Sequence, residues 1–404
     1  MVKCAWLALS LTLLSLGWGQ EVCVPDENCK RPDCVCASTE SYFASFDNSL
    51  TPQFVILSFD DAVTVTNNPF YLDLLNTYKN PNDCRISMTF FVSHLYNDYT
   101  MVNELHRLGS EIAVHSVTHK ADVEHYWRPA NYTVWQNEAV DMREMLVKYA
   151  YIPEADLKGF RAPFLEVGGN DMYQALYDSG FTYDCSWPAL QYTNWYGDEP
   201  KGALFPYTLD YQSPQDCTVG RCPDALFPGM WVAPMLDLKD NRGEACAMLD
   251  ACQGNYTDCA DQICEDNVFE FLRRNFEYNY KGNRAPFGVF THHSWFLLDE
   301  INESDAHTKG YLRFLQYVNS LPDVYIASMN RVLEWMKDPY PVMDLGSHPA
   351  FTCDSFDPIT TCPDPNTCNY KEGLPDPGLQ EVVMNVCSRP CPPKFPWLGN
   401  VDGN

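Results

Sequence analysis

The sequence is poor in positive charge and has no internal repeat or low-complexity segment. Its 404 residues contain 27 Lys and Arg against 54 Asp and Glu, which gives a formal net charge of −27. This balance argues against nucleic acid and anionic lipid as partners, because both bind basic surfaces. It leaves neutral polymers and cationic ligands open, and we interpret it mainly as a contribution to solubility.

Long apolar runs are also absent beyond the first residues. Lys3 precedes a mostly apolar stretch over residues 5–16, and small residues stand at Gly17 and Gly19. This pattern predicts a cleaved secretory signal peptide over residues 1–19, which is too short and too weakly flanked for a membrane anchor. We therefore expect a secreted, extracellular protein without a membrane segment.

Cysteine is abundant, as expected outside the cell. The sequence has 18 cysteines, and 18 less Cys4 of the signal peptide leaves 17, so one lacks an intramolecular partner. Cys217 with Cys222, and the four cysteines between 246 and 264, predict disulfide staples in loops. For Cys34-Val35-Cys36, disulfides are favoured over a zinc cluster. Three N-glycosylation acceptors predict surface positions, at Asn131, Asn255 and Asn302.

Strand-like and helix-like segments alternate along most of the chain. We expect strands at 53–59, 86–92, 111–114, 158–161, 181–185, 230–236, 287–291 and 324–327. We expect helices at 67–78, 101–108, 131–149, 171–179, 267–278, 308–319 and 331–336. This alternation predicts an α/β fold whose parallel sheet is closed or nearly closed into a barrel.

Two irregular stretches interrupt the alternation, residues 187–229 and 240–265. The first is rich in aromatic residues and proline and the second in cysteine, so both are expected to be long loops on the rim, where substrate contacts are usual. The barrel core is expected over about 50–338, with cysteine-rich extensions packed on it. Residues 20–404 would then form a single domain.

His115 and His119 stand four residues apart, directly after the apolar run 111–114. If the chain turns helically there, this spacing places both rings on one face. Two imidazoles can hold a divalent ion such as zinc, but a third ligand is usually needed. We therefore expect a carboxylate from elsewhere in the chain to complete the site.

Other polar residues also follow expected strands, where the active sites of barrels lie. Of the adjacent Asp60 and Asp61, one can bind metal while the other acts as a base, although a solvated acidic turn is the alternative. Arg161 would orient one of these carboxylates, unless it forms a surface salt bridge. Only one of His292 and His293 should reach the cleft, because alternate residues of a strand face opposite ways, and it would protonate a leaving amine.

Flat aromatic faces for sugar rings would come from Trp187 and Trp295. With 10 tryptophans in the chain, core packing is the commoner role for any one of them. The remaining histidines have no comparable placement, and we interpret them as structural or exposed: His94, His106, His125, His307 and His348.

Five short motifs stand in order along the chain. They are Phe59-Asp60-Asp61-Ala62-Val63, His115-Ser116-Val117-Thr118-His119, Arg161-Ala162-Pro163-Phe164, Asp184-Cys185-Ser186-Trp187 and His292-His293-Ser294-Trp295-Phe296. Together they resemble the five motifs of family 4 of the carbohydrate esterases, the polysaccharide deacetylases. This resemblance implies a distorted (β/α)7-8 barrel of the NodB type with long, disulfide-stapled loops.

The flanks, residues 29–36 and 391–400, are similar to those of arthropod chitin deacetylases. The added chitin-binding and lipoprotein-receptor-like modules of many relatives are not found, as in the short insect subgroup linked to gut lining. The resemblance therefore implies a secreted enzyme of the gut lining or cuticle matrix that acts on chitin or chitooligosaccharides, and we expect a monomer.

The resemblance also implies roles for the matching residues. Asp61, His115 and His119 would bind zinc or another divalent ion such as cobalt. Asp60 would deprotonate the attacking water, and Arg161 would orient Asp60.

Further implied roles concern the substrate. His292, three residues before Trp295 as in the family, would protonate the leaving amine. A backbone N–H near Phe164 would bind the oxyanion, Trp187 would flank the acetyl pocket, and Trp295 would contact substrate. Relatives usually have Ser at Cys185, and the other cysteines then pair evenly, so Cys185 is predicted to be a free thiol, half buried near the cleft.

The resulting prediction is a metal-dependent deacetylase that releases acetate and leaves glucosamine units. One alternative is a low-activity chitin-binding or matrix-organising protein that keeps the groove. The other is a deacetylase of a different acetylated polysaccharide, such as peptidoglycan or xylan. The full complement of base, acid and metal ligands favours an enzyme.

Overall fold

A nine-stranded sheet lies at the centre of the computed structural model, which describes residues 22–253, 261–297, 305–353 and 360–404. Its strands are β1 (Gln53–Asp60), β2 (Thr89–Val92), β3 (Glu111–Val114), β4 (Gly159–Phe160), β5 (Tyr183–Asp184), β7 (Tyr207–Leu209), β8 (Phe227–Val232), β12 (Phe287–Thr291) and β13 (Val324–Ile326). The order is β12–β1–β2–β3–β4–β5–β8–β7, with β13 also paired to β1. Every pairing is parallel except that of β7 with β8.

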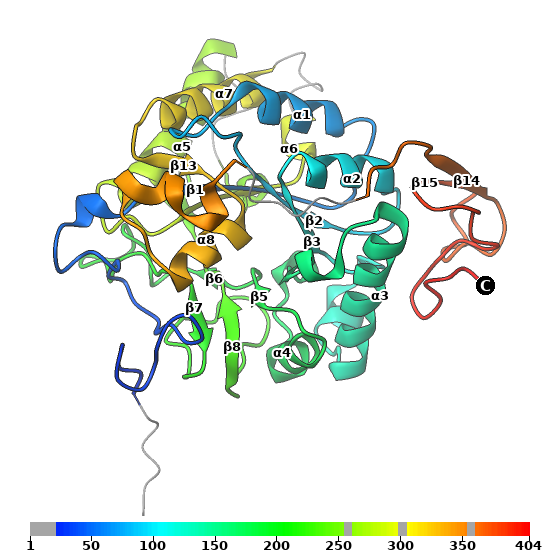
Figure 1. Ribbon diagram of the computed structural model, residues 1–404, viewed down its shortest axis with the longest axis horizontal. Helices are drawn as coiled ribbons and strands as arrows, with labels where there is room; N and C mark the ends of the chain where they lie inside the picture. Colours follow the sequence, from blue (N-terminus) through cyan, green and yellow to red (C-terminus); the bar gives the residue numbers. More distant parts are fainter. Residues whose placement is uncertain (1–21, 254–260, 298–304, 354–359) are drawn as a thin grey trace, which may run out of the picture.

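Helices lie around the outside of this sheet (Figure 1). They are α1 (Asn68–Thr77), α2 (Tyr99–Arg107), α3 (Tyr132–Ala150), α4 (Gly169–Asp178), α5 (Asp261–Tyr280), α6 (Ser294–Leu297), α7 (Ala306–Asn319) and α8 (Met329–Lys337). In the described part of the chain, the end strands β12 and β7 are not paired with each other, so the barrel is not fully closed by hydrogen bonds. The predicted distorted barrel is confirmed.

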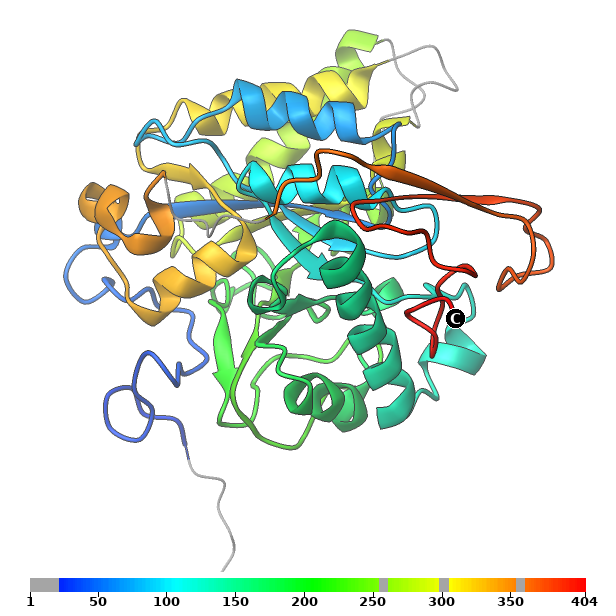
Figure 2. The same cartoon turned by 45° about the vertical axis from the view of Figure 1, so that its right-hand side comes forward.

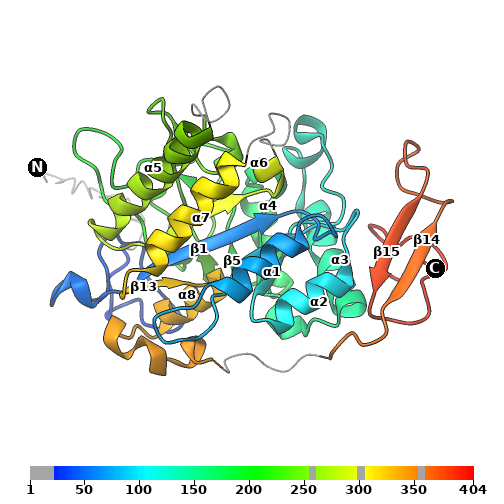
Figure 3. The same cartoon turned by 90° about the horizontal axis from the view of Figure 1, so that it is seen from above.

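Strand β1 runs through the middle of the barrel (Figure 3). All eight of its residues are buried, as the continuous apolar run predicted for a strand covered on both faces. It is hydrogen-bonded to β12 on one side and to β2 on the other. This position fixes the place where β1 ends, and Asp60 is its last residue.

Several expected boundaries differ from the structure. The strand expected at 86–92 begins only at Thr89. The strand expected at 230–236 is divided into β8 and β9 (Met235–Leu236), because Pro234 has no N–H to continue the ladder. Four short strands were not predicted. They are β7, in the first irregular stretch, β6 (Pro188–Ala189), which pairs with β9, and β10 (Leu238–Lys239), which pairs with β11 (Ala245–Cys246).

A C-terminal hairpin of β14 (Asn366–Tyr370) and β15 (Val382–Val386) was also missed by the sequence analysis. It extends from the side of the barrel near α2 and α3 (Figure 2). Asn385 of the hairpin donates a hydrogen bond to Asp98, and the N–H of Cys387 donates one to the carbonyl of Tyr149. The cysteine-rich extension is thus bonded to the barrel helices.

Disulfides staple the loops and both extensions. They join Cys23–Cys36, Cys29–Cys34, Cys84–Cys353, Cys217–Cys222, Cys246–Cys252, Cys362–Cys387 and Cys368–Cys391. The expected staples at 217–222 and in the 246–264 series are present, since Cys264 is also disulfide-bonded, while Cys259 lies outside the described residues. No thiolate cluster for zinc remains among the described N-terminal cysteines. Cys185 is the free cysteine of the described residues.

Two predictions concern the surface and the membrane. Asn131 is exposed at the N-cap of α3, whereas Asn255, Asn302 and the expected signal peptide lie outside the described residues. Among the described helices, none has both the length and the apolar character needed to cross a bilayer.

Candidate active site

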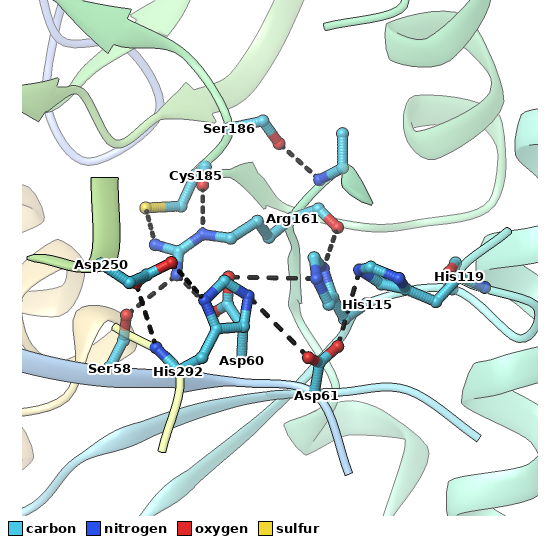
Figure 4. A network of polar contacts seen from close by, with 12 residues as sticks. Ser58, Asp60, Asp61, His115, His119, Arg161, Cys185, Ser186, Asp250 and His292 are labelled. Carbon is cyan, nitrogen blue, oxygen red and sulfur yellow. Dashed lines mark hydrogen bonds and ion pairs between the residues drawn. The ribbon is translucent and has the colours of Figure 1, made fainter. Parts of the chain in front are cut away.

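Six parallel strands, β12, β1, β2, β3, β4 and β5, end side by side, and five of these ends carry a residue of the sequence motifs. The residues are His292 after β12, Asp60 and Asp61 at the end of β1, His115 after β3, Arg161 after β4 and Cys185 after β5. Neighbouring strands in a parallel sheet bring their carboxyl ends to one edge, so these side chains converge (Figure 4). The motif residues of the sequence thus meet in one place.

The turn that carries the two histidines is not helical, contrary to the expectation. Ser116 has φ 74° and His119 has φ 39°, and both values leave the right-handed helical region. The turn is held instead by Glu138 of α3, which accepts hydrogen bonds from the N–H groups of Val117 and Thr118 and from the Thr118 hydroxyl. The ring centroids of His115 and His119 nevertheless lie 4.9 Å apart. The histidines meet through this turn and not through helical spacing.

Asp61, His115 and His119 fit a divalent metal ion. Each offers a ligand atom, and the three atoms lie within 4.8 Å of one another. His115 Nδ1 donates to the carbonyl of Arg161 at 2.8 Å, which leaves the lone pair on Nε2 for a metal. Burial and the nearby His119 ring hold the pKa of His115 well below its usual value, so it is neutral. Within the described residues, buried Nε2 of His119 makes no hydrogen bond, as a ligand atom requires.

Asp60 is held by a buried arginine. Arg161 Nη1 lies 2.6 Å from Asp60 Oδ1 and 2.9 Å from the hydroxyl of Ser58. Its Nε donates to the carbonyl of Cys185 at 2.7 Å, and its Nη2 lies 3.1 Å from the Cys185 sulfur. Asp60 Oδ2 points toward Nε2 of His115, at 3.9 Å. One carboxylate oxygen is therefore fixed while the other faces the metal ligands.

Cys185 is 0% exposed, so the expectation of a half-buried thiol is wrong although the residue is free. Burial raises its pKa to about 11, with Arg161 opposing the effect, and the thiol stays protonated.

His292 lies between two carboxylates. Its Nδ1 is 2.9 Å from Asp250 Oδ2, and its Nε2 is 3.8 Å from Asp61 Oδ2. Burial alone lowers the pKa of His292, but the hydrogen bond to Asp250 and the charges of Asp60, Asp250 and Asp61 raise it to about 9. The imidazole is thus protonated at neutral pH. His293 turns away and packs against Phe70, Tyr71 and Phe296.

Asp250 and Glu138 were not predicted from the sequence. Asp250 lies in the cysteine-dense loop that follows β11, 42 residues before its partner His292. Glu138 stands 20 residues from Thr118, on a helix with ordinary periodicity. Neither residue belongs to a local pattern, so no signal in a single sequence points to them.

A cavity of about 650 Å³ opens over these residues. Phe164 and Leu165 form part of its wall, with φ values of 58° and 56°, and the Phe164 ring is 46% exposed beside His119. Asp61 also has a positive φ, 77°. Non-glycine residues in this conformation are costly, and they gather where function demands a particular side-chain direction.

The two tryptophans expected to contact sugar are buried and do not line this cavity. Trp187 is 1% exposed, and its Nε1 donates to the carbonyl of Asp216 at 2.7 Å. Trp295 is 2% exposed and packs edge-on against His307. The expected stacking faces are therefore not available, and core packing, the alternative role for any single tryptophan, describes both residues.

The chain is similar in sequence to known proteins. A family model described as polysaccharide deacetylase matches residues 47–183. Chitin deacetylase 8 of Bombyx mori is 36% identical over 97% of this chain and 97% of that protein. Chitin deacetylase 1 of Bombyx mori is 31% identical over 93% of this chain and 68% of that protein. Among solved structures, the Xyl-CE4 domain of a multidomain xylanase from the hindgut metagenome of Trinervitermes trinervoides is 15% identical over 71% of this chain and 92% of that chain, with a TM-score of 0.36.

Proposed function

The chain belongs to the polysaccharide deacetylases, family 4 of the carbohydrate esterases, and on this premise we propose that it is a secreted, metal-dependent deacetylase of chitin or chitooligosaccharides. The observation that carries the proposal is the cluster of Asp61, His115 and His119 between a buried carboxylate and a protonated histidine, in a chain similar over nearly its whole length to chitin deacetylase 8.

The ion would be held by Asp61, His115 and His119, and zinc suits their nitrogen and oxygen atoms. When bound, it supplies positive charge that polarises the acetyl carbonyl and makes a water easier to deprotonate. The described residues contain two groups of potential metal ligands. The second group consists of Cys23, Cys29 and Cys36, which form disulfides, so only the Asp61, His115 and His119 group among the described residues has ligand atoms available for an ion.

Asp60 is proposed as the base. Its Oδ1 is occupied by Arg161, so Oδ2 is the oxygen that takes a proton from the attacking water. The water oxygen forms a bond to the amide carbonyl carbon. Arg161 orients the carboxylate through this buried, charge-assisted hydrogen bond.

His292 is proposed as the acid. Its Nδ1 is engaged by Asp250, so the proton on Nε2 faces the cavity. When the C–N bond breaks, the departing glucosamine nitrogen takes this proton, and acetate is released. The backbone N–H of Phe164 is proposed to bind the carbonyl oxygen as negative charge develops on it.

Secretion is proposed from the apolar start of the sequence and from the disulfides in both extensions. The same extensions contact the barrel, which supports residues 20–404 as one catalytic unit, proposed to act as a monomer.

Acetate release tests the proposal. Chitooligosaccharides, colloidal chitin, acetylated xylan and peptidoglycan would be compared before and after chelation and after return of zinc or cobalt. We expect chitin-derived substrates to react best and chelation to stop the reaction. Asp60→Asn and His292→Ala should each lose activity about 10²–10⁴-fold, and His125→Ala, at an 85% exposed side chain, should not. Full activity after chelation or in the Asp60 variant would refute it.

A further inference from the structure

The cavity over the active site is lined by acidic residues, and one of them has no role in the proposed reaction. Its wall contains Asp60, Asp237 and Asp250 and three histidines, His115, His119 and His292, but among the described lining residues no Lys or Arg. Asp60 is paired with Arg161, and Asp250 is hydrogen-bonded to His292. Asp237 has no role in the proposed reaction.

The position of Asp237 is fixed by its backbone. It directly follows β9, and its N–H donates to the carbonyl of Ala189 at 3.1 Å, which extends the pairing of β6 with β9. Its carbonyl accepts a hydrogen bond from Trp195 Nε1 at 2.9 Å. Because both backbone groups are engaged, the side chain is presented to the cavity from a rigid edge.

Asp237 is 8% exposed, and no hydrogen bond joins its carboxyl to another described residue. Burial, with the charge of Asp216 adding to it, raises the pKa of Asp237 to about 7. Asp216 itself is satisfied by the N–H groups of Leu190 and Gln191. A buried carboxyl without a donor is costly, and a ligand with a positive charge or a donor group removes that cost.

We propose that Asp237 binds the ammonium group of a glucosamine unit that lies beside the acetylated sugar in the cavity. The inference rests on the proposed function and extends it to a substrate class, chains that already carry some free amines. Removal of an acetyl group turns a neutral amide into an amine that is cationic at neutral pH, so the polymer acquires this charge during the reaction. No Lys or Arg of the described wall competes for Asp237, and low polarity strengthens the attraction.

Partly deacetylated substrates should therefore be preferred. The test substrates are oligosaccharides with one free amine beside an acetylated unit. For these, we expect kcat/KM of the wild-type enzyme to be at least about tenfold higher than that of Asp237→Asn, a difference of ~1.4 kcal/mol. For fully acetylated oligosaccharides, the two enzymes should differ less than about twofold. Asp198→Asn is the matched control, because Asp198 is exposed, does not line the cavity and undergoes the same change of charge.

Calorimetric binding of fully deacetylated glucosamine oligomers provides a second readout that needs no turnover. Asp237→Asn should bind them at least about tenfold more weakly, Asp237→Glu should restore part of the affinity, and added salt should weaken binding to wild type more than to Asp237→Asn. If acetylated and deacetylated oligomers lose affinity equally, Asp237 is a contact for a neutral group and the inference is wrong. It is also wrong if neither loses affinity. If no substrate releases acetate, the proposed function is wrong. The calorimetric comparison would still test whether Asp237 binds the ammonium group, because it requires no turnover.

Discussion

Arg161 and Asp60 form a buried ion pair at the base of the cavity. The Nη1 and Oδ1 atoms lie 2.6 Å apart, and the two side chains are 0% and 2% exposed. The guanidinium also lies 4.0 Å and 4.8 Å from the ring centroids of Phe91 and Phe290. The attraction within a buried ion pair adds little net stability to the fold. Removing one partner is strongly destabilising, however, because the other charge stays buried without a counter-charge.

Replacing the arginine should therefore damage both stability and activity. In Arg161→Met the charge of Asp60 stays buried without a partner, and we expect the free energy of unfolding to fall by about 3–5 kcal/mol. Chemical denaturation measures this loss, and acetate release should fall with it. Arg389→Met is the control, since its pair with Asp364 is exposed, at 57% and 74%, and should change stability little. Equal losses in the two variants would contradict the role of the buried pair.

Metal and activity should disappear together when a ligand is removed. His115→Ala and His119→Ala each delete one of the three grouped ligand atoms, so we expect the metal content of the purified protein, measured by mass spectrometry, to fall well below one ion per chain. Asp60→Asn should keep the metal and lose activity, because Asp60 is proposed as a base and not as a ligand. A metal-free Asp60→Asn variant would require a different assignment of the two aspartates.

Asp250 should set the alkaline limit of the reaction. Its hydrogen bond and charge help to raise the pKa of His292, and the proposed acid must be protonated to act. In Asp250→Asn this support is lost, so the pKa of His292 falls and kcat should decline at a lower pH than in wild type. The pH profile of kcat measures the shift. An unchanged alkaline limb would show that Asp250 does not act through His292.

Cys185 should be the one reactive thiol, and only after unfolding. The residue is fully buried and its thiol is protonated, so iodoacetamide should leave the native protein unmodified and label Cys185 in denaturant. Peptide mapping locates the label, and a different labelled cysteine would refute the pairing. Cys185→Ser keeps an acceptor for Arg161 and should retain activity, whereas Cys185→Val removes it and should lower kcat.

Glu111 should make stability depend on pH at the other end of the barrel. Burial raises its pKa from 4.5 to about 7, although Asn330, Tyr183 and Thr89 donate hydrogen bonds to it. The folded chain thus holds this proton more tightly than the unfolded chain. Its contribution to stability is present below pH 4.5 and is lost as pH rises through about 7.

Glu111→Gln removes this titration. Between these pH values, the Tm of wild type minus that of the variant should decrease by at least ~2–4 °C. Differential scanning calorimetry at several pH values measures the difference, and Glu144→Gln, on the exposed face of α3, is the control. A constant difference would show that Glu111 does not titrate in this range.

The sequence by itself determined which residues stand at the strand ends. Apolar runs such as 53–59 and 111–114 are local signals, and parallel strands bring their carboxyl ends to one edge, so Asp60, Asp61 and His115 were predicted to converge without any coordinates. The odd cysteine was also countable from the sequence alone, and it is Cys185 among the described residues.

Only the tertiary structure decided how these residues are supported and which side chains the cavity presents. Asp250 and Glu138 act on partners 42 and 20 residues away, a separation that no periodic pattern encodes. The same holds for Trp187 and Trp295, because a strand end fixes where a residue lies but the packing of neighbouring loops decides whether its ring faces substrate or core. Asp237 is a further residue that only the tertiary structure could identify. The lack of a hydrogen-bond donor at its carboxyl depends on the folded surroundings and cannot be read from the sequence.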